Sequence, residues 1–179
     1  MKKLFTSLFL LGMIVPFGAS AQFQLKNETA TYPDNAPIPV HPVPSDRQLL
    51  WNETEFYAFF HYGMNTFTGS EWGFGNEAES RYAPKAMPNP EQWVTAGKAA
   101  GMNGGIAVVQ HHDGFWVWPT ATTSHSIKNA GNEYGRSANI PKLFADASRK
   151  HGMKYGFYIS PWDRNSAHYG KDTYVTEVF

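Results

Sequence analysis

The feature that most constrains the fold is an alternation of three short apolar runs with two segments that have helix signals. The runs lie at residues 55–61, 104–109 and 154–160, and their length and content of aromatic or β-branched residues are typical of buried strands. Repeated strand–helix units imply a parallel sheet with right-handed crossover connections. The alternation therefore predicts an α/β domain.

Both segments between the runs have clear start and stop signals for a helix. An asparagine cap followed by a proline in the first turn opens each one, at Asn89 and at Asn139. A glycine, Gly101 or Gly152, is the expected C-terminal stop. In the first helix, the residues that recur with the spacing of a packing face are Trp93, Ala96, Gly97 and Ala100.

A parallel sheet of three strands cannot close, and it would leave apolar faces and edges bare. We therefore expect the chain to be the first part of a larger domain, with residues 45–179 as the N-terminal part of this truncated domain, which opens with a short helix over residues 46–52. Long polar loops after every strand favour a (β/α)8 TIM barrel, whose active site lies at that end. A flavodoxin-like sheet is the alternative, but the sequence lacks a glycine-rich phosphate loop leading into a helix.

The first 21 residues have the pattern of a secretory signal peptide. Lys2 and Lys3 precede an apolar stretch at residues 4–15, and the small residues at 19–21 fit a cleavage site before Gln22. The apolar stretch is too short for a permanent membrane anchor. The sequence has no cysteine, so we expect an exported protein without disulfides, in a bacterial periplasm or outside the cell.

The segment at residues 22–44 contains five prolines, which predicts an extended arm rather than a packed element.

The charge composition limits the classes of partner that the chain can bind. The whole chain has 15 basic and 15 acidic residues, so its formal net charge is zero. Such a balance gives no electrostatic attraction to a phosphate backbone or an anionic lipid surface, and we expect neither nucleic acid nor membrane as a partner.

The ends of the three predicted strands have side chains suited to a sugar. In a barrel, these ends converge on one pocket. Neutral imidazoles donate and accept hydrogen bonds, a carboxylate accepts them, and Trp or Tyr offers a flat apolar face to C–H groups. The candidate binding residues are His61, Glu71, Trp72, His111, His112 and Tyr158, with Trp162 and Asp163 as possible rim residues.

A metal site is the competing interpretation, because His, Glu and Asp at strand ends also bind zinc. Two observations weigh against it. Adjacent histidines in an extended chain point to opposite faces, which separates His111 from His112. The sequence also lacks a His-x-His pair. The pattern therefore favours sugar binding over metal binding.

Four segments in order resemble a known family. They are His61-Tyr62-Gly63-Met64-Asn65-Thr66-Phe67-Thr68, Glu71-Trp72-Gly73, His111-His112-Asp113-Gly114-Phe115 with Trp118-Pro119, and Tyr158-Ile159-Ser160-Pro161-Trp162-Asp163-Arg164-Asn165. From about residue 44 to residue 179 the chain resembles the N-terminal part of an α-L-fucosidase of glycoside hydrolase family 29. The first and last segments look more like the branch that acts on α-1,3/1,4-linked fucose. Gln110 departs from the lysine often found before the histidine pair, which bears on fine specificity.

The resemblance implies a TIM-barrel enzyme that removes terminal α-L-fucose from oligosaccharides or glycoconjugates with retention, without a metal or cofactor. The family's fucose-binding residues match His61, Glu71, Trp72, His111 and His112, with Tyr158 as an addition. A retaining mechanism needs two carboxyl groups about 5 to 5.5 Å apart. The resemblance implies a nucleophilic Asp and an acid/base beyond Phe179, so no residue of this chain is expected to be catalytic, and the chain alone is expected to be inactive.

The carboxylates of this chain therefore have other expected roles. Asp113, in a tight His-Asp-Gly turn, is interpreted as structural, and Asp163 is expected to pair with Arg164 and shape the rim. Two other classes of protein remain open. One is a metal-dependent hydrolase on the same barrel, and the other is a non-catalytic protein that binds fucose.

Overall fold

The computed structural model of the chain describes residues 40–178. The chain divides into two units, residues 1–46 and 47–179. In the described part of the first unit, residues 40–45 are exposed and form no helix or strand. The expected signal peptide and residues 22–39 of the expected arm lie outside the described residues. No helix in the described part of the chain is long and apolar enough to cross a membrane.

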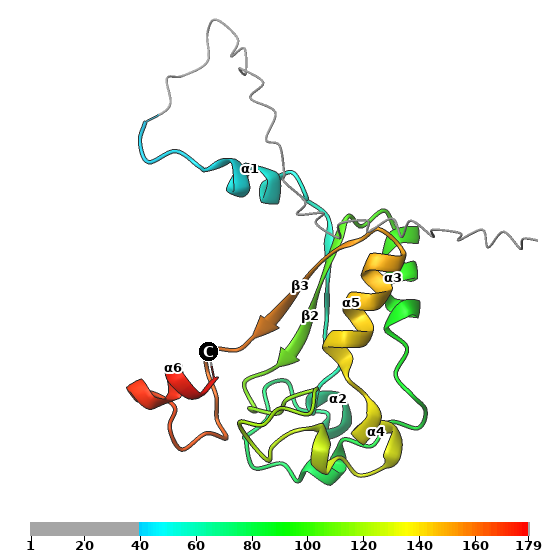
Figure 1. The fold of residues 1–179 in the computed structure, drawn as a ribbon, viewed down its shortest axis with the longest axis vertical. Coiled ribbons are helices and arrows are strands. Elements are labelled where there is room, and N and C mark those ends of the chain that lie inside the picture. Colours follow the sequence, from blue (N-terminus) through cyan, green and yellow to red (C-terminus); the bar gives the residue numbers. More distant parts are fainter. Residues whose placement is uncertain (1–39, 179) are drawn as a thin grey trace, which may run out of the picture. The chain divides into compact units, whose positions relative to one another are not determined.

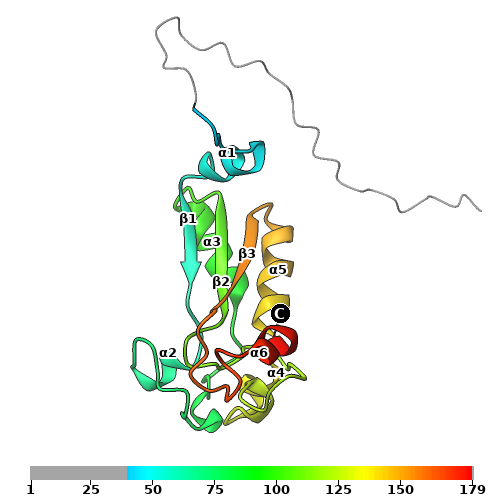
Figure 2. The same ribbon diagram turned by 90° about the vertical axis from the view of Figure 1, so that its left-hand side faces the viewer.

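The second unit is built on a parallel sheet of three strands, shown in Figures 1 and 2. The sheet order follows the chain: β1 (Tyr57–Phe60), β2 (Gly104–Gln110) and β3 (Lys154–Ile159). Helix α3 (Pro90–Ala99) connects β1 to β2, and α5 (Ile140–Lys150) connects β2 to β3. The predicted alternation and the parallel sheet are confirmed.

The two crossover helices begin and end where their sequence signals lie. The capping side chain, Asn89 or Asn139, accepts a hydrogen bond from the backbone N–H three residues on, at 3.3 and 3.1 Å. Each helix has a proline in its first turn. Gly101 and Gly152 follow the helices with φ of +86° and +61°, a conformation that a glycine adopts without steric cost. The local chemistry of the caps therefore sets the length of both helices.

The core lies between β2 and the two crossover helices, which pack against each other on one face of the sheet (Figures 1 and 2). Val94 of α3 and Phe144 of α5 are fully buried there, in one apolar cluster with Ala107 and Val109 of β2. Ala107 and Val109 are two residues apart in β2, so their side chains point to the same face of the sheet. The cluster fixes β2 at the centre of the unit and so positions the residues that follow it.

The long connections hold more structure than expected. They contain α2 (Asn65–Thr68), α4 (Glu133–Ser137) and the 3₁₀ helices η1 (Glu79–Arg81) and η2 (Ile127–Asn129). The long polar loop predicted after the second strand is wrong in this respect, because Phe115, Val117 and Ile127 are buried in the core cluster. Phe115 and Val117 are two residues apart, but an alternation that short indicates no strand, and Ile127 lies ten residues further on, so periodicity could not identify them. The remaining helices are α1 (Asp46–Asn52), over the predicted range, and α6 (Asp172–Val178).

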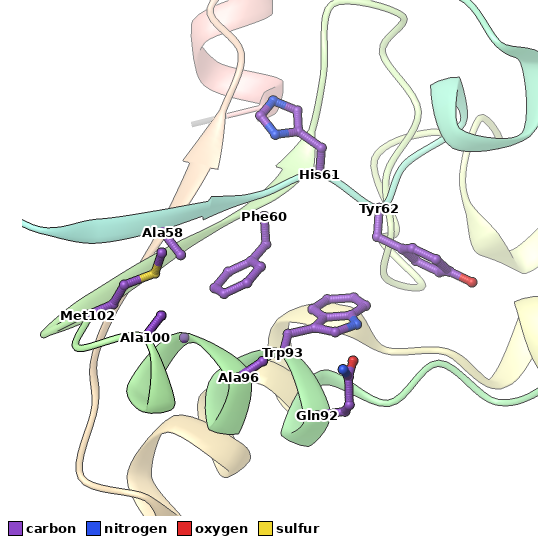
Figure 3. A pocket seen from close by; sticks show the side chains of 10 residues that line it. Ala58, Phe60, His61, Tyr62, Gln92, Trp93, Ala96, Ala100 and Met102 are labelled. Carbon is purple, nitrogen blue, oxygen red and sulfur yellow. The ribbon is translucent and has the colours of Figure 1, made fainter.

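The packing face predicted for α3 is only partly covered. Gly97 is buried, but Ala96 and Ala100 are exposed, while Val94 is the fully buried side chain of the helix. The predicted face lines an open, mainly apolar cavity of about 440 Å³ between α3 and β1, where Phe60 and Trp93 lie side by side (Figure 3). The spacing found the face of α3 that is turned towards β1, but no described residue fills the cavity in front of it.

Candidate functional site

The candidate residues gather at the C-terminal ends of the three strands. His61 follows β1, His111 and His112 follow β2, and Trp162 lies just after β3. Their rings form a continuous row: His61 to His111 at 5.7 Å between centroids, His111 to His112 at 4.4 Å, and His112 to Trp162 at 5.1 Å. Trp72, from the loop after β1, joins the row at 5.8 Å from His112. Residues from three separate segments thus meet at one edge of the sheet.

A cavity of about 240 Å³ lies at this edge, and His61, Glu71 and His111 line it together with Asn65 and Gln110. It is smaller than the cavity between α3 and β1, but polar side chains from the loop after β1 and from the end of β2 converge on it, which is the usual character of a ligand site. His61 borders both cavities, but in Figure 3 its ring lies on the opposite side of β1 from Phe60, away from the apolar residues of the larger cavity. The smaller cavity is therefore the candidate site.

The other candidates lie around this cavity. His112, Trp72 and Trp162 form the adjoining ring cluster described above. Tyr158 does not line the cavity, and its ring packs edge-on against Phe59 of β1 at 5.5 Å. The structure thus brings His61, Glu71 and His111 together, sets Trp72 and His112 beside them, and leaves Tyr158 on the sheet.

Both central histidines favour the neutral form. Burial, and then the proximity of His112 and His61, lowers the pKa of His111 to about 4. Burial, and then the positive charge of Arg164, lowers the pKa of His112. A neutral imidazole has one N–H donor and one nitrogen acceptor. At neutral pH, the pair therefore offers both kinds of hydrogen bond to a ligand.

The geometry expected for the histidine pair is wrong. His111 and His112 do not point to opposite faces, since their rings are in contact at 4.4 Å. The reason is that β2 ends at Gln110 and the next residues turn, closed by a hydrogen bond from Gly114 N to His111 O at 2.9 Å. The argument against a metal that rested on extended geometry therefore fails. Among the residues that the structure describes, no group of three or more His, Cys, Asp or Glu side chains is arranged to hold a metal ion.

Ser160, at the end of β3, anchors His112. Its hydroxyl lies 2.7 Å from Nδ1 of His112 and donates to the carbonyl of Trp162 at 2.6 Å. Its own backbone N–H donates to the side-chain oxygen of Gln110 at 2.8 Å. The sequence predicted none of these three contacts. It pointed to Ser160 only as part of the Ser-Pro-Trp segment that follows the third strand.

Asp113 is buried in the turn that follows the histidine pair. It is 1% exposed, and its Oδ1 accepts a hydrogen bond from Phe115 N at 2.7 Å. Its Oδ2 is buried and has no hydrogen-bond partner among the described residues. Burial raises the pKa of Asp113 to about 6, and the nearby carboxylates Glu77 and Asp163 add to the rise. Asp113 does not line the cavity, and its contact with Phe115 supports a role in shaping the turn.

The ion pair expected between Asp163 and Arg164 is wrong, and Asp163 is no rim residue. It is 5% exposed, and its Oδ1 accepts from the backbone N–H groups of Asn165 and Ser166, both at 2.9 Å. Its Oδ2 accepts from the Tyr174 hydroxyl at 3.2 Å. An aspartate at the start of a turn often bonds the N–H groups that follow it, and here this local preference decides its direction.

Arg164 instead ties the loop after β3 to the loops after β1 and β2. Its guanidinium donates to the carbonyl of Gly73 at 2.5 Å, and its backbone N–H donates to His112 O at 2.9 Å. Asn165 adds a hydrogen bond from Nδ2 to the carbonyl of Gly75 at 2.8 Å. A side chain at Gly75 would lie 2.5 Å from the backbone of Arg164, so only glycine fits there. The roles of Asn165 and Gly75 had no signal in the sequence beyond the residue types.

Comparisons with known proteins agree on one family. The sequence profile of the family described as alpha-L-fucosidase matches residues 43–178. Alpha-L-fucosidase 1 of Arabidopsis thaliana is 38% identical over 143 residues, which are 80% of this chain and 28% of that protein. Human tissue alpha-L-fucosidase is 24% identical over 177 residues, covering 84% of this chain and 36% of that protein. The chain thus spans about a third of the length of these relatives or less.

Solved structures give the same result. A glycoside hydrolase 29 family member from an unknown rumen bacterium has 43% sequence identity and a TM-score of 0.71, with 78% of this chain and 25% of that chain covered. A Ruminococcus gnavus GH29 fucosidase in complex with fucose has 33% identity and a TM-score of 0.66, with 78% and 28% covered. The α/β fold described above is therefore like that of the GH29 fucosidases.

Proposed function

The chain belongs to the α-L-fucosidase family, and from this premise we propose that it is part of a retaining α-L-fucosidase. The proposed reaction is hydrolysis of terminal α-L-fucose from oligosaccharides or glycoconjugates. The observation that carries the proposal is the cavity lined by His61, Glu71 and His111, at the strand ends of a chain that matches this family. One of the similar structures is described as a complex with fucose, which supports the sugar as the ligand class.

The chemistry of the cavity suits a sugar with several hydroxyls. Neutral histidines donate to and accept from hydroxyl groups, and the exposed Glu71 carboxylate accepts from them. The Trp72 ring is 50% exposed and offers an apolar face beside His112. Such a face packs against the C–H side of a sugar ring. We propose His61, Glu71, Trp72, His111 and His112 as the fucose-binding residues, with Tyr158 as an addition.

The proposal extends to the architecture of the whole protein. Residues 45–179 would form the first β/α units of a TIM barrel, and the nucleophilic Asp and the acid/base would come from residues after Phe179. The support is the sheet itself, because the outer strands β1 and β3 each pair only with β2 among the described residues. We further propose export by a signal peptide at residues 1–21, no metal or cofactor, and a preference for α-1,3/1,4-linked fucose.

The test compares the product of the complete reading frame with residues 22–179 alone, on an aryl α-L-fucoside. We expect the full-length protein to release fucose as the α-anomer first, and residues 22–179 to release none. Turnover by residues 22–179 that is lost in Asp113→Asn or Asp163→Asn would contradict the proposed position of the catalytic carboxylates. Fucose binding without turnover would indicate a binding protein, and activity abolished by a chelator and restored by zinc would indicate a metal-dependent hydrolase.

His112 offers a direct test of the binding residues. In the full-length protein, His112→Ala should weaken fucose binding by about 1 to 3 kcal/mol, because the fucose hydroxyl that His112 binds would be enclosed in the site without a hydrogen-bond partner. His151→Ala is the matched control. His151 caps α5 and pairs with Glu91 at 2.9 Å, away from the C-terminal ends of the strands where the candidate site lies. An unchanged inhibition constant for free fucose in His112→Ala would remove His112 from the site.

A further inference from the structure

The hydroxyl of Ser160 has a full set of hydrogen bonds. It lies 2.6 Å from the carbonyl oxygen of Trp162, 3.1 Å from the backbone nitrogen of Trp162, and 2.7 Å from Nδ1 of His112. A serine hydroxyl has one O–H donor and two acceptor lone pairs. Three neighbours therefore use its whole capacity, and each neighbour must take a fixed role.

The carbonyl of Trp162 settles the direction of these bonds. A carbonyl oxygen only accepts, so the single proton of Ser160 goes to Trp162 O. The backbone N–H of Trp162 only donates, so it occupies one lone pair of the hydroxyl. The remaining lone pair faces Nδ1 of His112, which must then carry a proton.

Ser160 itself cannot easily move to a different arrangement. It is fully buried, and its backbone N–H donates to both oxygens of Gln110, the side-chain Oε1 at 2.8 Å and the carbonyl at 3.1 Å. The side-chain bond needs an acceptor at residue 110, which glutamine provides and which a lysine in the same place would lack. Gln110 thus supports Ser160, and Ser160 supports the imidazole.

We propose that Ser160 is a positioning residue that holds His112 as the Nδ1–H tautomer, so that Nε2 is presented to the substrate as a hydrogen-bond acceptor. Nε2 has no hydrogen-bond partner among the described residues, and it is not buried without one. The low pKa of His112 agrees with a neutral ring that keeps this lone pair free. The other ring nitrogen of a histidine commonly sets which nitrogen is available in this way.

The assignment predicts what His112 recognises. An Nε2 lone pair accepts from a hydroxyl but repels an acceptor, so His112 selects a ligand group that donates. This step rests on the proposed function, since it takes the donating group to be a fucose hydroxyl. A fluorine in place of that hydroxyl keeps the size but cannot donate, so it would meet the lone pair unfavourably. Nε2 as a donor would instead tolerate fluorine better than hydrogen.

The first measurement reads the proton directly and needs no ligand. The full-length protein is labelled with ¹⁵N in its histidine rings, and the signals of His112 are assigned by their loss in His112→Ala. We expect the Nδ1 shift of a protonated nitrogen and the Nε2 shift of an unprotonated one at neutral pH. A proton on Nε2, or an equal mixture of tautomers, would overturn the proposal. In Ser160→Ala, we expect the mixture to appear, because the fixed acceptor at Nδ1 is gone.

The second measurement uses inhibition constants of L-fucose and of its monodeoxy and monodeoxyfluoro analogues. At one ring position, the fluoro analogue should bind roughly tenfold or more weakly than fucose and no better than the deoxy analogue, since the hydrogen bond to Nε2 of His112 is lost. In Ser160→Ala, this discrimination should shrink. Ser148→Ala is the matched control, because Ser148 is equally buried but its hydroxyl has no hydrogen-bond partner within residues 40–178.

The two measurements fail separately. If the full-length protein binds no fucose but His112 carries its proton on Nδ1, the proposed function fails and the role of Ser160 stands. If fucose binds and is hydrolysed but the fluoro analogue binds better than the deoxy analogue at every position, the proposed function stands and the acceptor role of Nε2 is overturned.

Discussion

The central strand and its two neighbours differ sharply in burial, although all three are mainly apolar. In β2, Ala107, Val108 and Val109 are at most 4% exposed, whereas Phe59 of β1 is 46% exposed and Phe157 of β3 is 44% exposed. These two large apolar side chains of the outer strands are thus far less covered than the smaller ones of β2. Position in the sheet, and not hydrophobicity, decides burial here, because only β2 has a strand on either side among the described residues.

The small residues of β2 belong to the same contrast. A side chain at Gly105 would lie 2.9 Å from Phe60, 3.0 Å from Phe144 and 3.1 Å from Met153. The glycine therefore leaves room for large side chains from β1 and α5. At Gly156 in β3, a Cβ would meet only Ile106, at 3.8 Å. The centre of the sheet is filled by its neighbours, while the outer strands still have space around them.

The largest effect is expected from Phe144→Ala, which should lower the free energy of unfolding by about 3 to 5 kcal/mol, since it leaves a cavity in the core. Phe157→Ala should approach the same cost in the full-length protein, because the proposed barrel covers β3. The measurement is urea unfolding of both variants. A cost of about 1 kcal/mol for Phe157→Ala, as for a half-exposed side chain, would mean that β3 stays uncovered and would contradict the barrel.

Asp113, buried after β2, predicts a dependence on pH. Burial raises its pKa from 3.8 to about 6, so between these values the folded state binds more protons than the unfolded state. Stability therefore falls as pH rises through this window, by a total on the order of 3 kcal/mol above it. Asp113→Asn cannot ionise and should escape this fall.

The measurement for Asp113 is the free energy of unfolding of wild type and Asp113→Asn between pH 4 and pH 7. The gain of the variant over wild type should grow with pH and level off above about pH 6. Asp146→Asn is the control on the exposed side of α5, where Lys142 and Arg149 lower the pKa of the carboxyl. A gain for Asp113→Asn that does not change with pH would show that the carboxyl does not titrate in this range.

The smallest expected effects come from the two glycines. Gly105→Ala should cost about 1 to 3 kcal/mol, because the added methyl group overpacks the contact between Phe60 and Phe144. Gly156→Ala should be neutral or stabilise by about 0.4 to 1 kcal/mol, since it restricts the unfolded chain and the added methyl group makes only an ordinary contact with Ile106. Thermal unfolding of the two variants compares them directly. Equal costs would contradict the difference in packing between β2 and β3.

The parts of the fold that were predictable depend on local chemistry. Asn89 and Asn139 predict their helices because a capping side chain bonds to a backbone N–H only three residues away. The buried loop residues Phe115 and Ile127 were missed, because irregular chain has no period. The strands were found because short apolar runs between turn signals are typical of buried strands.

The candidate site was predictable as a set of residue types but not as a geometry. Asp163 and Arg164 are neighbours in sequence, yet the aspartate bonds the N–H groups of its own turn and the arginine reaches the carbonyl of Gly73. The contact between His112 and Ser160 joins residues 48 positions apart. Such pairings depend on the register between β2 and β3. The residue pattern of either strand alone does not predict that register.

The hydrogen bonds of Arg164 and Asn165 to Gly73 and Gly75 make the loops after β1 and β3 mechanically one body. A substitution at residue 75 would displace the backbone of Arg164, and with it the segment that includes Trp162 and contacts His112. Mutations in the two loops should therefore not have independent effects. Over evolutionary time, a change in one loop would persist only together with a matching change in the other, so the cluster of Trp72, His112 and Trp162 is inherited as a unit.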